Sequence, residues 1–348
     1  MSVPGSSNAL MLSAADEAVY SVERSLRFNN DDTPYLSFTP SSAGDQMTWT
    51  WSAWFKLSSP TVDASLLRSL FQARHSGIGG ISNYHRIVID EDGHIEIRHL
   101  YSGTDRGTLV TTASFFDYGA WYHIVYAFDT TQATPTDRQR LYVNGTEITS
   151  FSTRTDPALN FSGRVNEAST DHYLGDTVSG LFDGYMAEVH FVDGTALAAT
   201  DFGQYDSNNV WQPKAYSGTY GTNGWYLDFS DATSTTTIGE DSSGNSNDWT
   251  SSGISVTAGS GNDSVFDSPK DGTQTDSGAG GEVSGNYCTL DYYNSSNTGY
   301  HSQGNLSFDN SASSWHGALG TFPISSGKWY WEVTVDRASS GVSPAQYL

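Results

Sequence analysis

Two stretches of the chain alternate between apolar and polar residues with the period of two that a β-strand produces. The first is 48–57 (TWTWSAWFKL), where only Trp54 interrupts the polar face. Its apolar face consists of Trp49, Trp51, Ala53, Phe55 and Leu57. Such a stripe can stack on sugars, but tryptophan-rich stripes are more often sheet core, and we expect core here.

The second stretch is 184–193 (GYMAEVHFVD), and an Asp-Gly pair stands at each end of it. Strict alternation predicts two faces, one with Tyr185, Ala187, Val189 and Phe191, the other with Gly184, Met186, Glu188, His190 and Val192. Turn chemistry at both ends of an alternating run is typical of a strand.

Further segments predict strands and hairpins. The segment 86–100 predicts a hairpin around a turn at 91–94, and 140–148 predicts a second one around Asn144-Gly145, a strong two-residue turn signal. The strand 121–129 contains His123, which we expect to be a buried histidine and not a ligand. We also expect two short strands in 24–38, a helix or strand in 62–75, and a last strand at 225–229 that packs back on the others.

These segments contain motifs in the order of one known family. The motifs are W-Y-H-I at 121–124, L-Y-V-N-G at 141–145, Y-L-G at 173–175 and F-D-G-Y-M-A-E-V at 182–189. The stretch 24–194 therefore resembles a laminin-G-like domain of the concanavalin A-like class. The resemblance implies an all-β protein that begins with a jelly-roll β-sandwich.

The composition changes twice further along the chain. Runs such as TSTTT and DSSGNSND indicate loops, with Trp249 among a few apolar residues suited to pin them to a neighbour. The motif SSGKWYWEVTVD at 325–336 resembles the second strand of SPRY domains, but 286–348 is shorter than the roughly 100 residues of a sandwich. We therefore expect an arm at 1–22, the laminin-G-like domain at 23–230, a Gly/Ser/Thr-rich linker at 231–285 and an incomplete, SPRY-like second β-sandwich at 286–348.

The charge and the cysteine content exclude several classes of function. Lys and Arg number 16 against 39 Asp and Glu, a net charge of -23, which argues against binding of nucleic acid or of anionic membranes. No apolar run is long enough to span a bilayer, so we expect no membrane insertion. The single Cys288 rules out an intrachain disulfide. The first residues do not form a secretory signal, so we expect synthesis in a cytoplasm.

The pattern of carboxylates does not predict an enzyme. Glu96 lies on a strand like the paired-carboxylate strand of glycoside hydrolases, but its neighbours on the same face are His94 and Arg98. The second carboxylate that acid–base or nucleophilic catalysis needs is missing there. No G-x-S-x-G anchor appears either. We therefore expect a protein without catalytic residues.

The family resemblance implies a calcium ion at the rim of the sandwich. In such domains the aspartate just before the Y-L-G strand is a recurrent ligand, and Asp171 matches that place. Asp129 and Asp183 are further candidates because they stand at strand ends. Oxygen ligands in loops suit Ca²⁺. The alternative for each of the three is an ordinary turn aspartate.

The order of the modules also resembles the tail-fibre-type appendage proteins of marine tailed bacteriophages. That resemblance implies a virion protein, homo-oligomeric, whose partners are other virion subunits and a polysaccharide or protein of the host surface. Attachment through rim loops is the function we expect, with a purely structural decoration or connector role as the alternative. A polysaccharide depolymerase is a third hypothesis.

Overall fold

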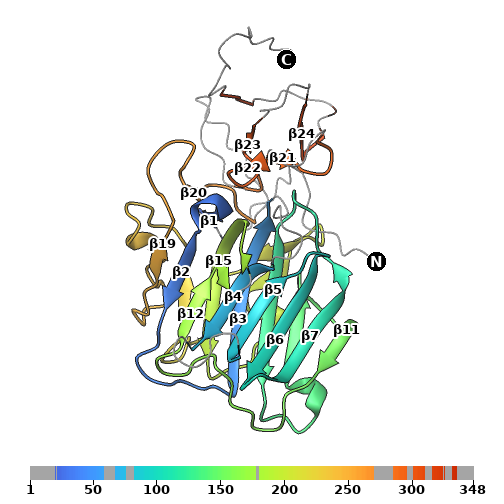
Figure 1. Cartoon of the computed structure of the whole chain (residues 1–348), viewed down its shortest axis with the longest axis vertical. Helices are drawn as coiled ribbons and strands as arrows, with labels where there is room; N and C mark the ends of the chain where they lie inside the picture. Colours follow the sequence, from blue (N-terminus) through green and yellow to red (C-terminus); the bar gives the residue numbers. More distant parts are fainter. Residues whose placement is uncertain are drawn as a thin grey trace.

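The computed structural model describes residues 20, 22–58, 67–75, 82–177, 180–269, 285–295, 301–309, 316–323, 325 and 331–334. Over these residues the chain forms β-strands and four short 3-10 helices, which confirms the all-β class (Figure 1). The helices are η1 (Asn30–Asp32), η2 (Pro135–Asp137), η3 (Ala199–Asp201) and η4 (Thr237–Gly239). None of the helices in the described part is long and apolar enough to cross a membrane.

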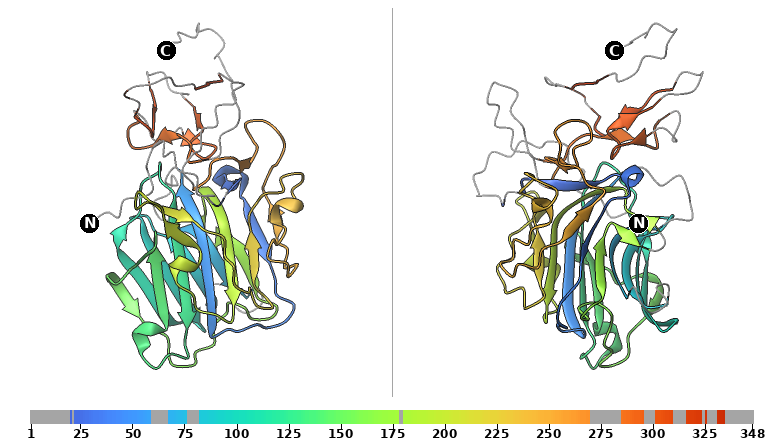
Figure 2. Two further views of the ribbon diagram at one scale, coloured as in Figure 1. Left: turned by 180° about the vertical axis from the view of Figure 1, so that it is seen from behind. Right: turned by 60° about the vertical axis from the view of Figure 1, so that its left-hand side comes forward.

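Two antiparallel sheets pack face to face as a β-sandwich (Figure 2). The front sheet has the order β11 (Phe151–Thr155), β7 (Thr104–Ser114), β6 (His94–Tyr101), β5 (Tyr84–Ile89), β4 (Arg68–Arg74), β12 (Asp171–Leu174), β2 (Tyr35–Phe38) and β19 (Thr250–Ser252). The back sheet has the order β10 (Thr146–Glu147), β9 (Gln139–Val143), β8 (Tyr122–Asp129), β3 (Thr48–Leu57), β15 (Gly184–Asp193), β1 (Ser25–Phe28) and β20 (Ser264–Val265), and β18 (Trp225–Leu227) pairs with β15.

The space between the sheets is filled by the predicted apolar face of β3. All five residues of that face belong to the inter-sheet core, and Trp54 points to the opposite side. Trp49 stacks on Phe128 at 5.0 Å, and Trp51 stacks on Phe71 of the front sheet at 5.8 Å. The prediction that this stripe is core, and not a sugar platform, is confirmed.

The strand β15 differs from the prediction because it contains a bulge. Between Ala187 and His190 it has one residue more than β3 opposite, and Glu188 takes a left-handed φ of 51°. An extra residue inverts the alternation. Val189 therefore faces the inter-sheet core, whereas Ala187 faces the outer side, and the prediction that these two residues share a face was wrong.

The outer side of the back sheet is covered by the chain that follows β15. Trp54 and Tyr185 pack there with Phe202 and Trp211, in a second apolar cluster. Trp211 donates its indole N–H to Nδ1 of His123 at 3.0 Å, which explains why this histidine is buried as predicted. The central strands of the back sheet are therefore buried on both faces.

The predicted hairpins are present. Asn144 and Gly145 both have positive φ, 46° and 79°, as a type I′ turn requires. The segment 62–75 forms strand β4 where it is described; 62–66 lies outside the described residues. Small ladders join β13 (Asp176–Thr177) to β14 (Gly180–Leu181) and β16 (Gly203–Tyr205) to β17 (Trp211–Pro213). The expected last strand, β18, pairs with β15.

The expected linker contributes strands to both sheets. β19 pairs with β2, and β20 pairs with β1. Trp249 lies in the inter-sheet core. The sandwich therefore extends beyond the expected boundary at residue 230, because these short strands bring apolar and charged side chains back to it.

Two buried ion pairs attach this returning chain to the back sheet. Arg27 Nε donates to Asp263 at 3.0 Å, and Lys56 Nζ donates to Asp267 at 2.9 Å. The Lys56 ammonium is fully buried and also donates to Asn286 Oδ1 and Tyr287 O. Because Trp121 donates to the same carboxylate, this cluster joins the back sheet to the chain on both sides of 270–284.

The region 286–348 contains only short ladders in its described part. β21 (Leu290–Asp291) pairs with β24 (Leu319–Gly320), and β22 (His301–Ser302) pairs with β23 (Ser307–Phe308). Of the SPRY-like motif, 331–334 is exposed and not in a strand, whereas Trp329 and Val335 lie outside the described residues. In the expected arm, the described residues are Tyr20 and Val22, which pack on the outer side of the back sheet.

We expect Trp51→Ala to lower the free energy of unfolding by about 3–5 kcal/mol, because it removes a buried indole and leaves a cavity. Urea denaturation followed by circular dichroism measures this. Trp331→Ala is the control, since Trp331 is 61% exposed and its removal should change stability by less than about 0.5 kcal/mol. Equal effects of the two substitutions would contradict the assignment of the core.

We expect Asp267→Ala to cost about 3–5 kcal/mol, because it leaves the Lys56 ammonium buried without its counter-charge. The exposed pair Arg140–Asp137 has a similar distance of 2.9 Å, so Asp137→Ala is a matched control with an expected cost of about 0–1 kcal/mol. The double variant Lys56→Met/Asp267→Leu should recover most of the loss in the same denaturation assay. A loss in Asp267→Ala no larger than that of the control would show that the pair is not needed.

Candidate functional site

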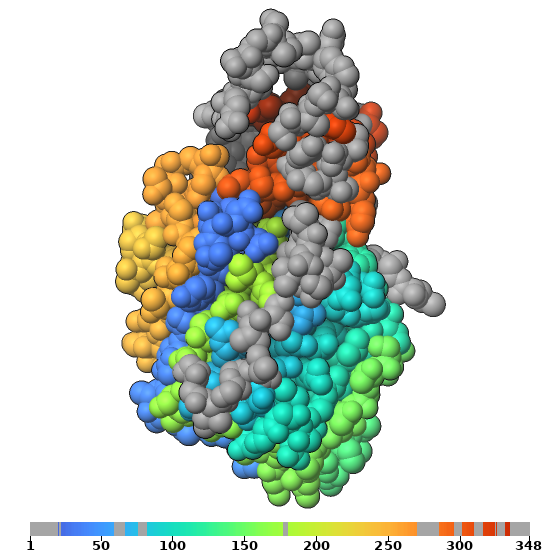
Figure 3. Space-filling model, in the orientation of Figure 1, coloured from blue at the N-terminus to red at the C-terminus, as the bar shows by residue number. Residues whose placement is uncertain are grey.

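The outer face of the front sheet is the broad sheet face that the described chain leaves partly open to solvent. Residues on β6 alternate between buried and partly exposed, as they do on β12, whereas β5 of the same sheet is buried throughout, and so is β15 of the back sheet apart from its last residue. Figure 3 shows this side of the molecule, where atoms of β6, β7 and β11 (cyan to green) reach the surface. A ligand that binds to a sheet face is therefore expected here.

One row of polar residues crosses this face from strand to strand. Hydrogen-bonded register places its members side by side. In order across the sheet they are Thr155, Thr108, Arg98, Arg86, Gln72 and Tyr173. Their side chains share one face because each alternates with a residue that points into the core.

Each arginine on this face is held by a carboxylate. Arg86 Nε donates to Glu96 at 2.9 Å, and Arg98 Nε donates to Asp105 at 3.2 Å. The second pair is the more open one, with exposed fractions of 36% and 35%. Guanidinium and carboxylate groups fixed side by side offer donors and acceptors in a defined geometry.

Tyrosines complete the face at its other end. The Arg74 guanidinium lies 4.1 Å from the centre of the Tyr173 ring and donates to Asp176 at 3.0 Å. Tyr35 contacts the edge of Tyr173 at 5.9 Å. Aromatic faces beside polar groups suit a ligand that has both apolar C–H surfaces and hydroxyl groups.

The arginines were missed by sequence reasoning. Arg74, Arg86 and Arg98 recur at equal intervals along a run of hairpin-connected strands, and this recurrence is a signal that the three lie on neighbouring strands. Their pairing with acids makes this face close to neutral, although the chain as a whole has a net charge of -23.

The three predicted calcium ligands do not form one site. Asp129 pairs with Thr48 at one end of β3, whereas Asp183 precedes Gly184, which pairs with Leu57 at the other end. The ten residues of β3 span roughly 30 Å. Within the described ranges, no group of three or more His, Cys, Asp or Glu side chains has an arrangement suited to a metal ion.

Each of these aspartates has protein partners. Asp171 accepts a hydrogen bond from the Thr39 hydroxyl at 2.7 Å. Asp129 accepts from Thr131 and Gln132 at 2.6 Å each, in a turn typical of aspartate. Partial burial raises the pKa of Asp129, but these hydrogen bonds outweigh it, and the net pKa is lowered.

Asp183 is the exception, because its environment disfavours the charged form. Burial raises the pKa of Asp183 to about 6, although the Ser58 hydroxyl donates to its carboxylate at 2.6 Å. A carboxyl group that is partly protonated near neutral pH is a poor calcium ligand. The end of the sandwich at which Asp183 lies therefore holds a carboxyl group with a raised pKa, and this does not favour a cation site there.

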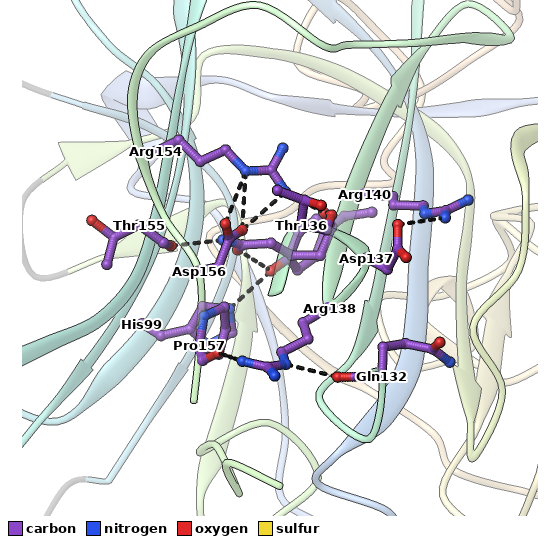
Figure 4. A network of polar contacts seen from close by, with 12 residues as sticks. His99, Gln132, Thr136, Asp137, Arg138, Arg140, Arg154, Thr155, Asp156 and Pro157 are labelled. Carbon is purple, nitrogen blue, oxygen red and sulfur yellow. Dashed lines mark hydrogen bonds and ion pairs between the residues drawn. The ribbon is translucent and has the colours of Figure 1, made fainter. Parts of the chain in front are cut away.

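A second polar network runs from the rim into the core (Figure 4). At the rim, Arg138 donates to Pro157 O at 2.8 Å and Arg154 donates to Asp156 at 3.0 Å. Gln139 links Asp156 to Tyr126, and Tyr126 contacts His99 at 3.0 Å. Sequence patterns did not indicate this network, because its members come from four separate strands and the loop after β11.

Comparison with family models places a domain in the first half of the chain. Residues 30–201 match the model described as the Concanavalin A-like lectin/glucanases superfamily. The comparison with curated proteins gave no match.

Solved structures with partial likeness include three examples. The native heptameric SAP-like pentraxin from Limulus polyphemus is 13% identical, with 52% of this chain and 80% of that chain covered and a TM-score of 0.37. The Ruminococcus gnavus IT-sialidase CBM40 bound to alpha2,3 sialyllactose is 14% identical, with 48% of this chain and 91% of that chain covered and a TM-score of 0.32. The LG1-3 region of the laminin alpha2 chain is 12% identical, with 49% of this chain and 31% of that chain covered and a TM-score of 0.36.

We expect the loss of the Asp183 proton to lower the stability of the protein as pH rises. Its folded pKa lies above the ordinary value of 3.8, so the folded state holds the proton more tightly, and this contribution is lost between about pH 4 and pH 6. In urea denaturation at pH 4, 5 and 6, the free energy of unfolding of the wild type should fall with rising pH relative to that of Asp183→Asn, because the difference between the two isolates the Asp183 contribution. Asp129→Asn is the contrasting variant, because the lowered pKa of Asp129 gives the opposite sign.

Carboxyl ¹³C NMR measures the same property directly. A titration midpoint of Asp183 at or below its ordinary value would contradict this prediction.

Proposed function

We propose that the protein binds carbohydrate on the outer face of its front sheet, because residues 30–201 match the model of the Concanavalin A-like lectin/glucanases superfamily. The observation that carries the proposal is the combination of this family match with a polar sheet face that is partly exposed at Arg98, Tyr173 and the edge strand β11, whereas Gln72 and Arg86 between them are buried. The back sheet is unsuitable in its described part, because its outer side is covered by Trp211 and its neighbours.

The side chains of the face supply what a saccharide needs. Arg98 and Asp105 together present a donor and an acceptor that match the hydroxyl groups of one sugar ring. Thr153 and Thr155 on the edge strand β11 are exposed and extend the polar surface. The Tyr173 ring, partly exposed, provides an apolar surface for the C–H groups of a pyranose at the other end of the row.

We propose, more specifically, that this binding attaches a virion appendage to a host-surface polysaccharide or protein. The support is the similarity of the module order to tail-fibre-type proteins of marine tailed bacteriophages. On this proposal the partners include other virion subunits and further copies of the chain, since appendages follow the symmetry of the particle.

A structural decoration or connector role is the second candidate. One observation favours it: the described part of 285–334 exposes large apolar side chains that a neighbouring subunit would cover. These are Tyr287, Tyr293, Leu306, Leu319, Trp331 and Val333. Locating the chain in intact particles by labelled antibody separates the roles, because a distal position without neighbours contradicts the connector role.

We propose a non-enzymatic protein. Glu96, the carboxylate nearest to a hydrolase pattern, is held in an ion pair with Arg86. A polysaccharide depolymerase remains the third hypothesis, and release of reducing ends from host polysaccharide by the purified protein would establish it.

Calcium is a further proposal. An ion at Asp171 would need ligands besides Asp129 and Asp183, such as the Thr39 hydroxyl and backbone carbonyl groups. Binding measured with and without EDTA tests whether any glycan affinity depends on it.

We expect Arg98→Ala to weaken glycan binding by about tenfold or more, because a hydrogen bond to a charged group contributes roughly 1.5–3 kcal/mol. A glycan array identifies the ligand, and calorimetry with that ligand measures the affinity of each variant. Arg140→Ala is the matched control: Arg140 is similarly exposed, at 42%, pairs with an aspartate, and lies on the back sheet.

Two outcomes would count against the proposed site. If no host polysaccharide binds, with or without calcium, the lectin function is wrong. If a glycan binds and Arg98→Ala and Arg140→Ala have equal affinity, the function stands but its location on the front sheet is wrong.

A further inference from the structure

Two histidines contact each other inside the apolar core. His85 of β5 and His99 of β6 are paired in register, and their Nδ1 atoms lie 3.1 Å apart. The exposed fractions of the two side chains are 0% and 2%. The rings around them are aromatic, with Trp49 5.2 Å from His85 and Phe128 4.7 Å from His99.

The hydrogen-bond network fixes the proton positions, starting from the rim. Gln139 Nε2 donates to Thr155 O at 2.7 Å and to Asp156 at 3.1 Å, so both of its hydrogens are used. Its Oε1 therefore accepts, and the Tyr126 hydroxyl donates to it at 3.1 Å. With its proton used, the Tyr126 oxygen accepts from Nε2–H of His99 at 3.0 Å.

The tautomers of the two histidines follow. A neutral imidazole with hydrogen on Nε2 has a bare Nδ1, so His99 Nδ1 accepts the bond from Nδ1–H of His85. His85 Nε2 is then an acceptor, fully buried, and no donor reaches it in the described structure. The core thus contains a basic nitrogen with no partner, at the inner end of a hydrogen-bond chain that begins at the rim.

We propose that the His85–His99 pair is an acid-sensitive switch that opens the β5–β6 side of the sandwich when it takes up protons. A proton on His85 Nε2 places a cation among aromatic rings. A second proton, on His99 Nδ1, makes two N–H groups point at each other. This breaks the side-chain contact between His85 on β5 and His99 on β6. Because His99 is bonded through Tyr126 and Gln139 to Asp156, the loss extends to the rim network.

The charged groups around the pair give little compensation. His172 of β12 faces it from the same core and would add a third positive charge; burial lowers its pKa to about 4. Asp105 of β7 and Asp156 are the nearby acids, but Asp105 is paired with Arg98 and Asp156 with Arg154. Burial lowers the pKa of His99 to about 3 and that of His85 well below its usual range, where His99 and His172 add to the effect.

The sign of the effect follows from linkage. The closed form keeps both imidazoles neutral, and the open form takes up protons below about pH 6.5. For each proton taken up, the opening constant rises about tenfold for every unit by which the pH falls. Opening is therefore suppressed at pH 7 and favoured in acid, without any ligand.

Amide hydrogen exchange tests the proposal on the full chain between pH 7 and pH 5, with rates corrected for intrinsic pH dependence. We expect the opening constants of β5 and β6 to rise at least tenfold by pH 5, and those of β1 and β15 to rise less. In His85→Gln/His99→Gln the amide groups keep a donor and an acceptor but do not titrate, so this rise should disappear. His94→Gln, on the exposed side of the same strand β6, is the control and should behave like the wild type.

Two results would overturn the switch: a rise of the same size in the double glutamine variant, or an equal rise in every strand, which indicates global unfolding. If the double variant does not fold, ¹⁵N NMR of the wild-type imidazoles at pH 7 decides. Hydrogen on Nε2 of His99 and on Nδ1 of His85 supports the proposal. Hydrogen on Nδ1 of His99, or a charged imidazole at either position, overturns it.

Discussion

The back sheet must be covered on both faces, and this requirement organises the chain around it. β3 and β15 have large apolar side chains on both sides, so one front sheet cannot bury them. The bulge at Glu188 divides β15 into a half that pairs with β1 and a half that pairs with β18. The chain after β15 then folds over the outer side, where Trp211 reaches His123. In the front sheet, β6, β12 and β11 have partly exposed residues on the outer side, and we propose that this part meets a ligand.

Much of the fold was predictable because its signals are local. The alternation of 48–57, the Asn144-Gly145 turn and the hairpin around 91–94 each depend on neighbours in sequence. The faces of 184–193 were not predictable, because alternation cannot reveal where an extra residue is inserted. The returning strand β19 was missed for a similar reason: three residues are too few to show a period.

The candidate site was harder to predict, because it depends on register between strands. Arg98 forms an ion pair with Asp105 across a turn, and Arg86 forms one with Glu96 on the next strand. The predicted aspartates failed as a group because strand ends that look alike in sequence lie at opposite ends of the sandwich. The buried histidines show the same limit: His123 was predicted to be buried, whereas the contact between His85 and His99 depends on the register of β5 and β6.

The Lys56–Asp267 cluster has a consequence for how much of the chain is needed to satisfy the buried charges of the sandwich. The family match ends at residue 201, yet the ammonium of Lys56, inside that range, finds its counter-charge 66 residues beyond that end. A lineage that exchanged the matched segment alone would transfer an unsatisfied charge with it. The segment that matches the family model is therefore shorter than the part of the chain that satisfies its buried charges, and Asp267 marks part of the difference.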